Sequence, residues 1–345
     1  MATLTAPTRT RSVAVARSAR GVLTSPKYGP VLVTGLLLVL MFAIGGTRYT
    51  GFVSPETVLN LLVDNAYLIV LAVGMTFVIL SGGIDLSVGA VVALSTMIAA
   101  SLLQAGWPPL VVIGLVLLVT ALLGLAVGLM VHVFGVQPFI ATLAAMFLAR
   151  GLCYVISNRA ISITDPFFVA MAQTDIPLGG RLDISISAVI ALVVVVIAVV
   201  VLRSTRFGRT VYALGGSEQS GVLMGLPTAR TKVGVYVISG LCSGLAGILF
   251  SFYTLSGYSL TAIGTELDAI AAVVIGGTLL SGGYGFVLGS VLGVLVLGTI
   301  QTMITFEGTL SSWWTRIFIG ALLLIFIVLQ KVLTGRARAN AGVRT

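Results

Sequence analysis

The feature that most constrains the fold is a run without formal charge, residues 86–149, which is far longer than one membrane span requires. Two short segments rich in Gly and Pro, residues 106–109 and 135–138, interrupt this run. Because Gly and Pro favour turns and are disfavoured inside helices, they divide the run into three predicted apolar helices. A chain with such a run is expected to cross a membrane several times.

The composition of the whole chain supports a membrane protein. Of its 345 residues, 58% are hydrophobic and only 8% are charged, and the mean hydropathy is +1.16. So few charged side chains could not cover a soluble domain with this much apolar sequence. The predicted fold class is an all-α polytopic membrane protein with about ten transmembrane helices.

The net charge of +9 comes mainly from two basic tails and a central basic loop at residues 203–232. Basic segments beside membrane spans are expected in the cytoplasm. We therefore predict a disordered cytoplasmic tail at residues 1–27, a transmembrane domain at 28–333 and a second cytoplasmic tail at 334–345. Residues 150–183 are expected outside. This distribution explains the basic character of the chain. Membrane lipid is therefore a predicted partner, and nucleic acid is not.

The central loop contains one predicted short helix, residues 217–224. Ser217 can cap its N-terminus and Glu218 suits the positive end of the helix dipole. A helix of about two turns is unstable alone, so it needs a surface to lie on. It is either a connector resting on the protein's own membrane face or a docking helix for a cytoplasmic partner. Its candidate contact residues are Ser217, Glu218, Gln219, Val222, Leu223 and Met224.

A weak internal repeat links the two halves of the chain. Residues 80–83, Leu-Ser-Gly-Gly, recur as residues 280–283, and a Gly follows each at the same spacing. Paired Gly-rich breaks at membrane depth indicate a transport pathway, because broken backbone there needs protein or a wet cavity around it. The alternative is two ordinary tight turns. If either turn is re-entrant, the helix count falls to eight or six. The candidate path or gate residues are Ser81, Gly82, Gly83, Ser281, Gly282 and Gly283.

Asp85 and Ser87 follow the first of these turns. A carboxylate beside a membrane segment is costly and by default indicates function. Asp85 can instead cap the N-terminus of the next helix. Both roles, helix cap and solute contact, are consistent with the sequence, and both residues join the candidate path.

No catalytic or metal-binding set is visible in the sequence. The two cysteines lie in apolar runs and the chain has one histidine, so neither a disulfide framework nor a metal site is predicted. Residues 277–282 have the outer glycines of a phosphate-binding loop, but Gly283 and Tyr284 stand where Lys and Ser or Thr are needed. If ATP drives this protein, another polypeptide must bind it.

Several segments resemble one transporter family. Residues 74–89, which include Ser81-Gly82-Gly83-Ile84-Asp85, resemble the signature of bacterial sugar ABC-transporter permeases of the ribose/xylose type. The resemblance continues through residues 205–216 and 266–277 and covers most of the chain beyond the N-terminal tail. Residues 74–89 and 308–315 are most similar to the galactofuranose permease branch.

This resemblance implies a multi-pass subunit of a sugar importer in the bacterial plasma (inner) membrane. It implies a second permease subunit, which in galactofuranose systems is a different polypeptide, an extracytoplasmic sugar-binding protein, and an ABC ATPase that binds ATP and Mg. No cofactor is expected on this chain. The segment at residues 217–224 would be the coupling helix on the ATPase, although Ser-Glu-Gln-Ser-Gly replaces the family's Asn-x-x-Ala-Ala there. An ion-coupled secondary transporter is the alternative, with Asp85 as its candidate charge.

Overall fold

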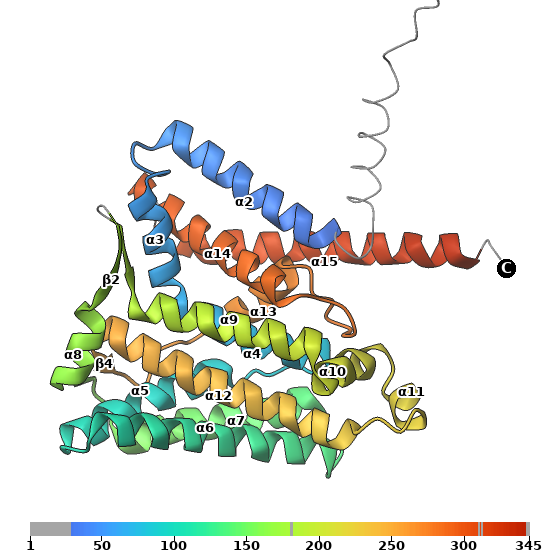
Figure 1. Ribbon diagram of the computed structural model, residues 1–345, viewed down its shortest axis with the longest axis horizontal. Helices are drawn as coiled ribbons and strands as arrows, with labels where there is room; N and C mark the ends of the chain where they lie inside the picture. Colours follow the sequence, from blue (N-terminus) through green and yellow to red (C-terminus); the bar gives the residue numbers. More distant parts are fainter. Residues whose placement is uncertain (1–28, 180–181, 310, 312, 343–345) are drawn as a thin grey trace, which may run out of the picture.

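The computed structural model describes residues 29–342 except 180, 181, 310 and 312, and it is a bundle of packed helices (Figure 1). The predicted tail at residues 1–27 lies outside the described residues. The first half contains α2 (Gly29–Arg48), α3 (Pro55–Asp64), α4 (Ala66–Leu80), α5 (Val88–Gln104), α6 (Pro109–His132), α7 (Pro138–Ile156) and α8 (Pro166–Gln173). The second half contains α9 (Ile186–Ser204), α10 (Arg206–Gly216), α11 (Glu218–Leu223), α12 (Thr228–Thr254), α13 (Thr265–Ile275), α14 (Val287–Glu307) and α15 (Trp313–Gly342).

Local sequence determines where several of these helices begin. Pro109 and Pro138 open α6 and α7, as predicted from the breaks in the uncharged run. Proline suits the first turn because its missing N–H would have no partner there. Ser185 and Thr205 cap α9 and α10 by accepting hydrogen bonds from backbone N–H groups of the first turn.

The helix lengths support a multi-pass membrane protein but do not confirm ten spans. Within the described residues, six helices are long and apolar enough to cross a membrane. A seventh span results if α3 and α4, which meet at a 55° bend, are counted together. The described apolar parts of α5 and α15 are shorter, and α13 has only 11 residues. The predicted count of ten therefore stays unconfirmed.

The described residues are mostly helical, in agreement with the predicted all-α class, and they also contain two short strand pairs that were not predicted. β1 (Ile161–Ser162) pairs with β4 (Ser256–Gly257), and β2 (Asp175–Gly179) pairs with β3 (Leu182–Ser185). Both pairs are antiparallel and lie in segments between the long helices. Their backbone groups have no helical partners, and the strand pairing supplies hydrogen bonds to them.

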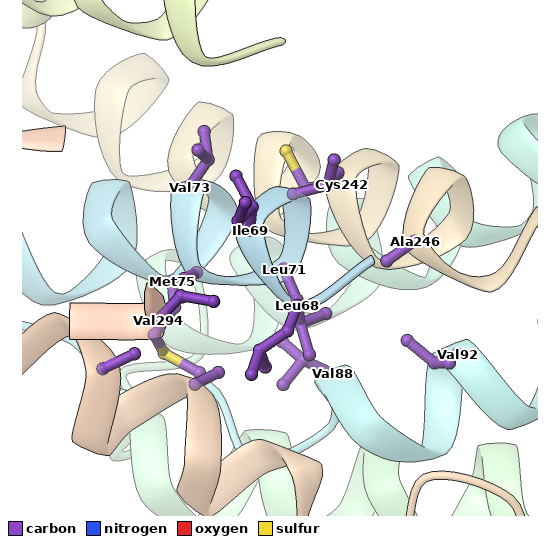
Figure 2. Close-up of a cluster of buried hydrophobic side chains, with 14 of the residues drawn as sticks. Leu68, Ile69, Leu71, Val73, Met75, Val88, Val92, Cys242, Ala246 and Val294 are labelled. Carbon is purple, nitrogen blue, oxygen red and sulfur yellow. The ribbon is translucent and has the colours of Figure 1, made fainter. Parts of the chain in front are cut away.

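The centre of the bundle is α4, which is buried on all sides. All but one of its residues are buried, and it packs against α12, α9, α14 and α13. Figure 2 shows its side chains meeting those of neighbouring helices. The drawn cluster includes Leu68, Ile69, Leu71, Val73 and Met75 from α4, Val88 and Val92 from α5, Cys242 and Ala246 from α12, and Val294 from α14. A helix that is apolar all round is expected at such a position.

The two ends of the bundle differ. The elements α3, α8, β2 and β4 gather at one end, and α10 and α11 lie at the other (Figure 1). The sequence predicts the first end outside and the second in the cytoplasm. Arg150, which was expected in the external loop, lies within α7 instead. Its Nη1 donates hydrogen bonds to the carbonyl oxygens of Ser259 at 2.6 Å and Thr261 at 2.8 Å, so it holds α7 against the segment before α13.

The predicted orientation can be tested by cysteine labelling. Ser217 precedes α11 and Thr174 follows α8, both residues are exposed, and the two helices lie at opposite ends of the bundle. In a chain whose buried Cys153 and Cys242 are replaced, an impermeant thiol reagent added to intact cells should label Thr174→Cys and spare Ser217→Cys. The reverse pattern would show that α10 and α11 face the outside.

Candidate functional site

The repeat seen in the sequence corresponds to a repeated helix–turn–helix unit. In the first half α4 leads through Ser81-Gly82-Gly83 into α5, and in the second half α13 leads through Ser281-Gly282-Gly283 into α14. The starts of α5 and α14, Val88 and Val287, are about 200 positions apart, as are the two turns. The two units thus place equivalent helices before and after each turn.

The two Gly-rich turns touch each other. The Gly283 N–H donates a hydrogen bond of 2.9 Å to the carbonyl oxygen of Leu80, at the end of α4. Gly82 and Gly282 both have positive φ, +84° and +82°, which glycine adopts at least cost. A Cβ on Gly282 would lie only 2.8 Å from the Gly82 backbone nitrogen. The two turns therefore meet backbone to backbone, and side chains at this contact would push them apart.

The end of α10 closes onto both turns. A Cβ on Gly215 would overlap the Leu80 carbonyl oxygen of one turn and the Gly283 nitrogen of the other. The Tyr212 hydroxyl donates a hydrogen bond of 2.9 Å to the Gly285 carbonyl oxygen and so fixes α10 to the second turn. We call this meeting point of Gly82, Gly282, Gly283 and Gly215 the glycine junction.

The short helix α11 continues directly from the glycine junction. As predicted from the sequence, Ser217 caps it, accepting a hydrogen bond of 3.2 Å from the Ser220 N–H. Glu218 forms an ion pair of 2.6 Å with Lys232 at the start of α12. The capped start and this ion pair hold α11 at a defined position next to the bundle.

The apolar side of α11 points away from the chain. Val222 is 56% exposed, Leu223 88% and Met224 66%, and Gln219 is exposed as well. The predicted connector lying on the protein's own surface would bury these side chains. The exposed patch of Val222, Leu223 and Met224, here called the α11 patch, agrees better with the docking alternative.

Asp85 lies inside the bundle and joins two helices. It is 4% exposed, and one carboxylate oxygen accepts hydrogen bonds from the Ser87 N–H at 2.9 Å and the Ser87 hydroxyl at 2.6 Å. The other oxygen accepts one of 2.7 Å from the hydroxyl of Ser239 on α12. The Ser87 contacts form a turn just before α5, whose N-cap is Ser87 rather than Asp85, so the predicted cap position is corrected by two residues. The contact with Ser239 was not predicted.

The remaining predicted path residues lie around the same turns. Ser81 donates a hydrogen bond of 2.8 Å to the Val78 carbonyl oxygen and closes the end of α4, whereas Ser281 is exposed. Gly83 has a negative φ, and its constraint is proximity: a Cβ there would lie 2.5 Å from the buried Tyr236 hydroxyl oxygen. The structure therefore unites Gly82, Gly282 and Gly283 and places Asp85 and Ser87 beside them, toward α12.

Sequence reasoning missed α10 and its role. The signals were present, because Thr205 precedes the helix as a cap and Phe207, Val211 and Leu214 recur at helical spacing. The basic residues around them indicated a loop instead. The contact of Gly215 with both turns has no local sequence signal.

These features define a class. A multi-pass helical bundle with two repeated helix–turn–helix units and Gly-rich breaks is the architecture of a membrane transport component. Residues 57–327 match the family model described as "Branched-chain amino acid transport system / permease component". The chain belongs to this family of permease components.

Curated relatives are similar over nearly their whole lengths. The inner membrane ABC transporter permease protein YjfF of Escherichia coli K12 is 48% identical, over 88% of this chain and 92% of the relative. The fructose import permease protein FruG of Bifidobacterium longum is 42% identical, over 88% and 90%. The ribose import permease protein RbsC of Bacillus subtilis is 37% identical, over 88% and 92%. No solved structure matches this chain significantly.

Proposed function

We propose that this chain is the membrane-spanning subunit of an ATP-driven importer of a monosaccharide. The observation that supports it most is the path from the exposed α11 patch through Ser217 and Gly215 to both repeated turns. A partner on the α11 patch would act on both halves at one point. The names of the relatives, which include fructose and ribose import permeases, support a sugar as the solute.

Backbone packing couples the movement of α10 to the two Gly-rich turns. Gly215, Gly282 and Gly283 touch through backbone, so a shift of α10 cannot be absorbed by flexible side chains. ATP and Mg are bound by the partner ATPase, and its movement is passed from α11 to α10 and then to the turns. The turns act as the gate, and opening them connects the solute path to the cytoplasm.

The assembly we propose contains four kinds of component: this chain, a second permease subunit, the ATPase and an extracytoplasmic sugar-binding protein. The second permease subunit is a different polypeptide, as the galactofuranose-type motif at residues 308–315 suggests. The complex lies in the bacterial plasma membrane with α10, α11 and both termini in the cytoplasm. Galactofuranose is the favoured solute.

The docking role of the α11 patch predicts a specific loss of partner binding. Leu223→Asp should weaken copurification of the ATPase by roughly thirtyfold or more, because an exposed apolar residue at the centre of an interface contributes about 2 kcal/mol or more. Leu223→Met is the matched control and should retain the partner. Unchanged copurification with Leu223→Asp would place the ATPase elsewhere.

The solute is tested by uptake in cells lacking their own transporters for the sugars used. We expect labelled galactofuranose to enter only when this chain and its partner subunits are present, and to be displaced poorly by ribose or fructose. If ribose or fructose enters equally well and galactofuranose does not, the galactofuranose assignment is wrong and the broader sugar assignment stands.

A further inference from the structure

A cavity of about 490 Å³ lies at the opposite end of the repeated helices from the glycine junction. Tyr67 from the first turn of α4 and Asp268 from the first turn of α13 line it. Gln301 near the end of α14 and Trp313 at the start of α15 complete its wall. Its volume falls within the range of about 300–1,000 Å³ that is usual for small-molecule sites.

The break between α3 and α4 opens onto this cavity. The two helices meet at a 55° bend, and the residue at the bend, Asn65, lines the cavity. The amide nitrogen of Asn65 donates a hydrogen bond of 2.9 Å to the Leu61 carbonyl oxygen, which fixes the orientation of the side chain. A broken helix in a membrane protein requires protein or a polar cavity beside it, and here a polar cavity is present.

A polar stripe on α14 faces the same space. Gln301 and Thr305 are one helical turn apart, both line the cavity, and both are exposed. They interrupt a helix that is otherwise apolar enough to span a membrane. Polar side chains on such a helix that face a cavity are expected to have a function.

The lining offers both hydrogen-bond donors and acceptors but little net charge. Asp268 and Arg316 are its charged residues, and the Arg316 Nη1 lies 3.2 Å from Oδ1 of Asp268, so the two charges offset each other. Asn65 and Gln301 can each donate and accept, which matches hydroxyl groups that do both. The rings of Tyr67 and Trp313 add apolar faces suited to the C–H face of a sugar ring. An anionic ligand would be repelled by Asp268, and a cationic ligand would be repelled by Arg316.

We propose that this cavity is a binding site for one neutral monosaccharide, a proposal that rests on the import function above. It receives the sugar at the end of the bundle away from α10 and α11. Because α4 and α13 run from the cavity toward the two Gly-rich turns, the sugar site and the glycine junction lie at opposite ends of the same helices.

Intrinsic fluorescence provides a direct binding test on the purified full chain. Trp107→Phe together with Trp314→Phe leaves Trp313 as the single tryptophan of the chain. Trp313 lines the cavity and is 76% exposed, so its fluorescence reports on this site. The probes are methyl galactofuranoside, D-ribose, D-fructose and L-arabinose, titrated to millimolar concentrations. We expect a saturable change with at least one of them.

Variants of α14 then locate the bound sugar. Gln301→Ala and Thr305→Ala should each raise the dissociation constant for the sugar by about threefold to tenfold, the effect of losing one hydrogen bond. The matched control is Thr302→Ala, because Thr302 lies on the same helix, donates a hydrogen bond of 3.0 Å to the Gly298 carbonyl oxygen and lies beside Phe42 and Phe52 instead of lining the cavity. That variant should leave the dissociation constant for the sugar unchanged.

The outcomes separate this inference from the proposed function. If the wild-type complex imports one of these sugars with ATP and the Trp313 signal does not respond to it, the cavity proposal is wrong and the import function stands. If phosphatidylglycerol vesicles change the signal and no sugar does, the cavity holds a lipid headgroup and the proposal is overturned. If no sugar is imported at all, the proposed function fails and this inference fails with it.

Discussion

Gly215→Ala is expected to reduce ATP-driven uptake by roughly tenfold or more while the chain still inserts and assembles. The added methyl group would overlap the Leu80 carbonyl oxygen and the Gly283 nitrogen, one atom from each turn. Such overpacking costs about 1–3 kcal/mol where the surroundings cannot yield, and backbone atoms yield little. Gly215 does not have a positive φ, so alanine does not strain α10 itself.

The adjacent glycine provides the matched control. A Cβ on Gly216 would meet no atom within 4 Å, so Gly216→Ala should transport at close to the wild-type rate. Both variants lie in α10 and make the same chemical change, which removes helix propensity as an explanation. Uptake, membrane amount and ATPase copurification are measured together. Equal uptake in the two variants would mean that the glycine junction does not transmit motion.

Asp85→Leu is expected to lower both stability and uptake strongly, whereas Asp85→Asn retains most of both. Leucine leaves the Ser87 N–H and the Ser87 and Ser239 hydroxyls without their acceptor inside the bundle. Each buried donor left without a partner costs about 1–3 kcal/mol. Asparagine keeps one oxygen toward Ser87, and its NH₂ group can donate to the Ser239 hydroxyl, which accepts as well as donates.

Thermal unfolding in detergent and uptake in vesicles should be compared for both Asp85 variants. Ser239→Ala serves as a milder reference, because it removes one of the three hydrogen bonds to the carboxylate and leaves the two from Ser87 in place. If Asp85→Asn folds normally but does not transport, the charge of Asp85 is required. That result would support the solute-contact or ion-coupling alternatives over a structural role.

The sequence predicts the parts of this fold that depend on neighbouring residues. The breaks before Pro109 and Pro138 and the capped helix after Ser217 follow from turn and cap chemistry a few residues away. The presence of two similar Gly-rich turns is also visible in the sequence. These predictions needed no knowledge of distant contacts.

The parts that were missed depend on residues far apart in the chain. Gly283 bonds to Leu80, Ser239 reaches Asp85, and Gly215 touches both turns. No local pattern encodes these pairings, because each turn taken alone is compatible with an ordinary connection. The strand pairing of Ile161 with Gly257 joins segments that lack a strand-like alternation, so two-residue strands were not predicted. The cavity beside Asn65 likewise combines residues from four helices.

The most direct test of the account is the energy source of transport in a defined system. This chain, the second permease subunit and the ATPase are reconstituted in vesicles with the binding protein outside, and labelled sugar uptake is measured with and without ATP inside. We predict uptake that requires hydrolysable ATP, is unaffected by collapsing proton and sodium gradients, and falls at least about tenfold in Gly215→Ala. Uptake that proceeds without ATP and follows an ion gradient would contradict the account.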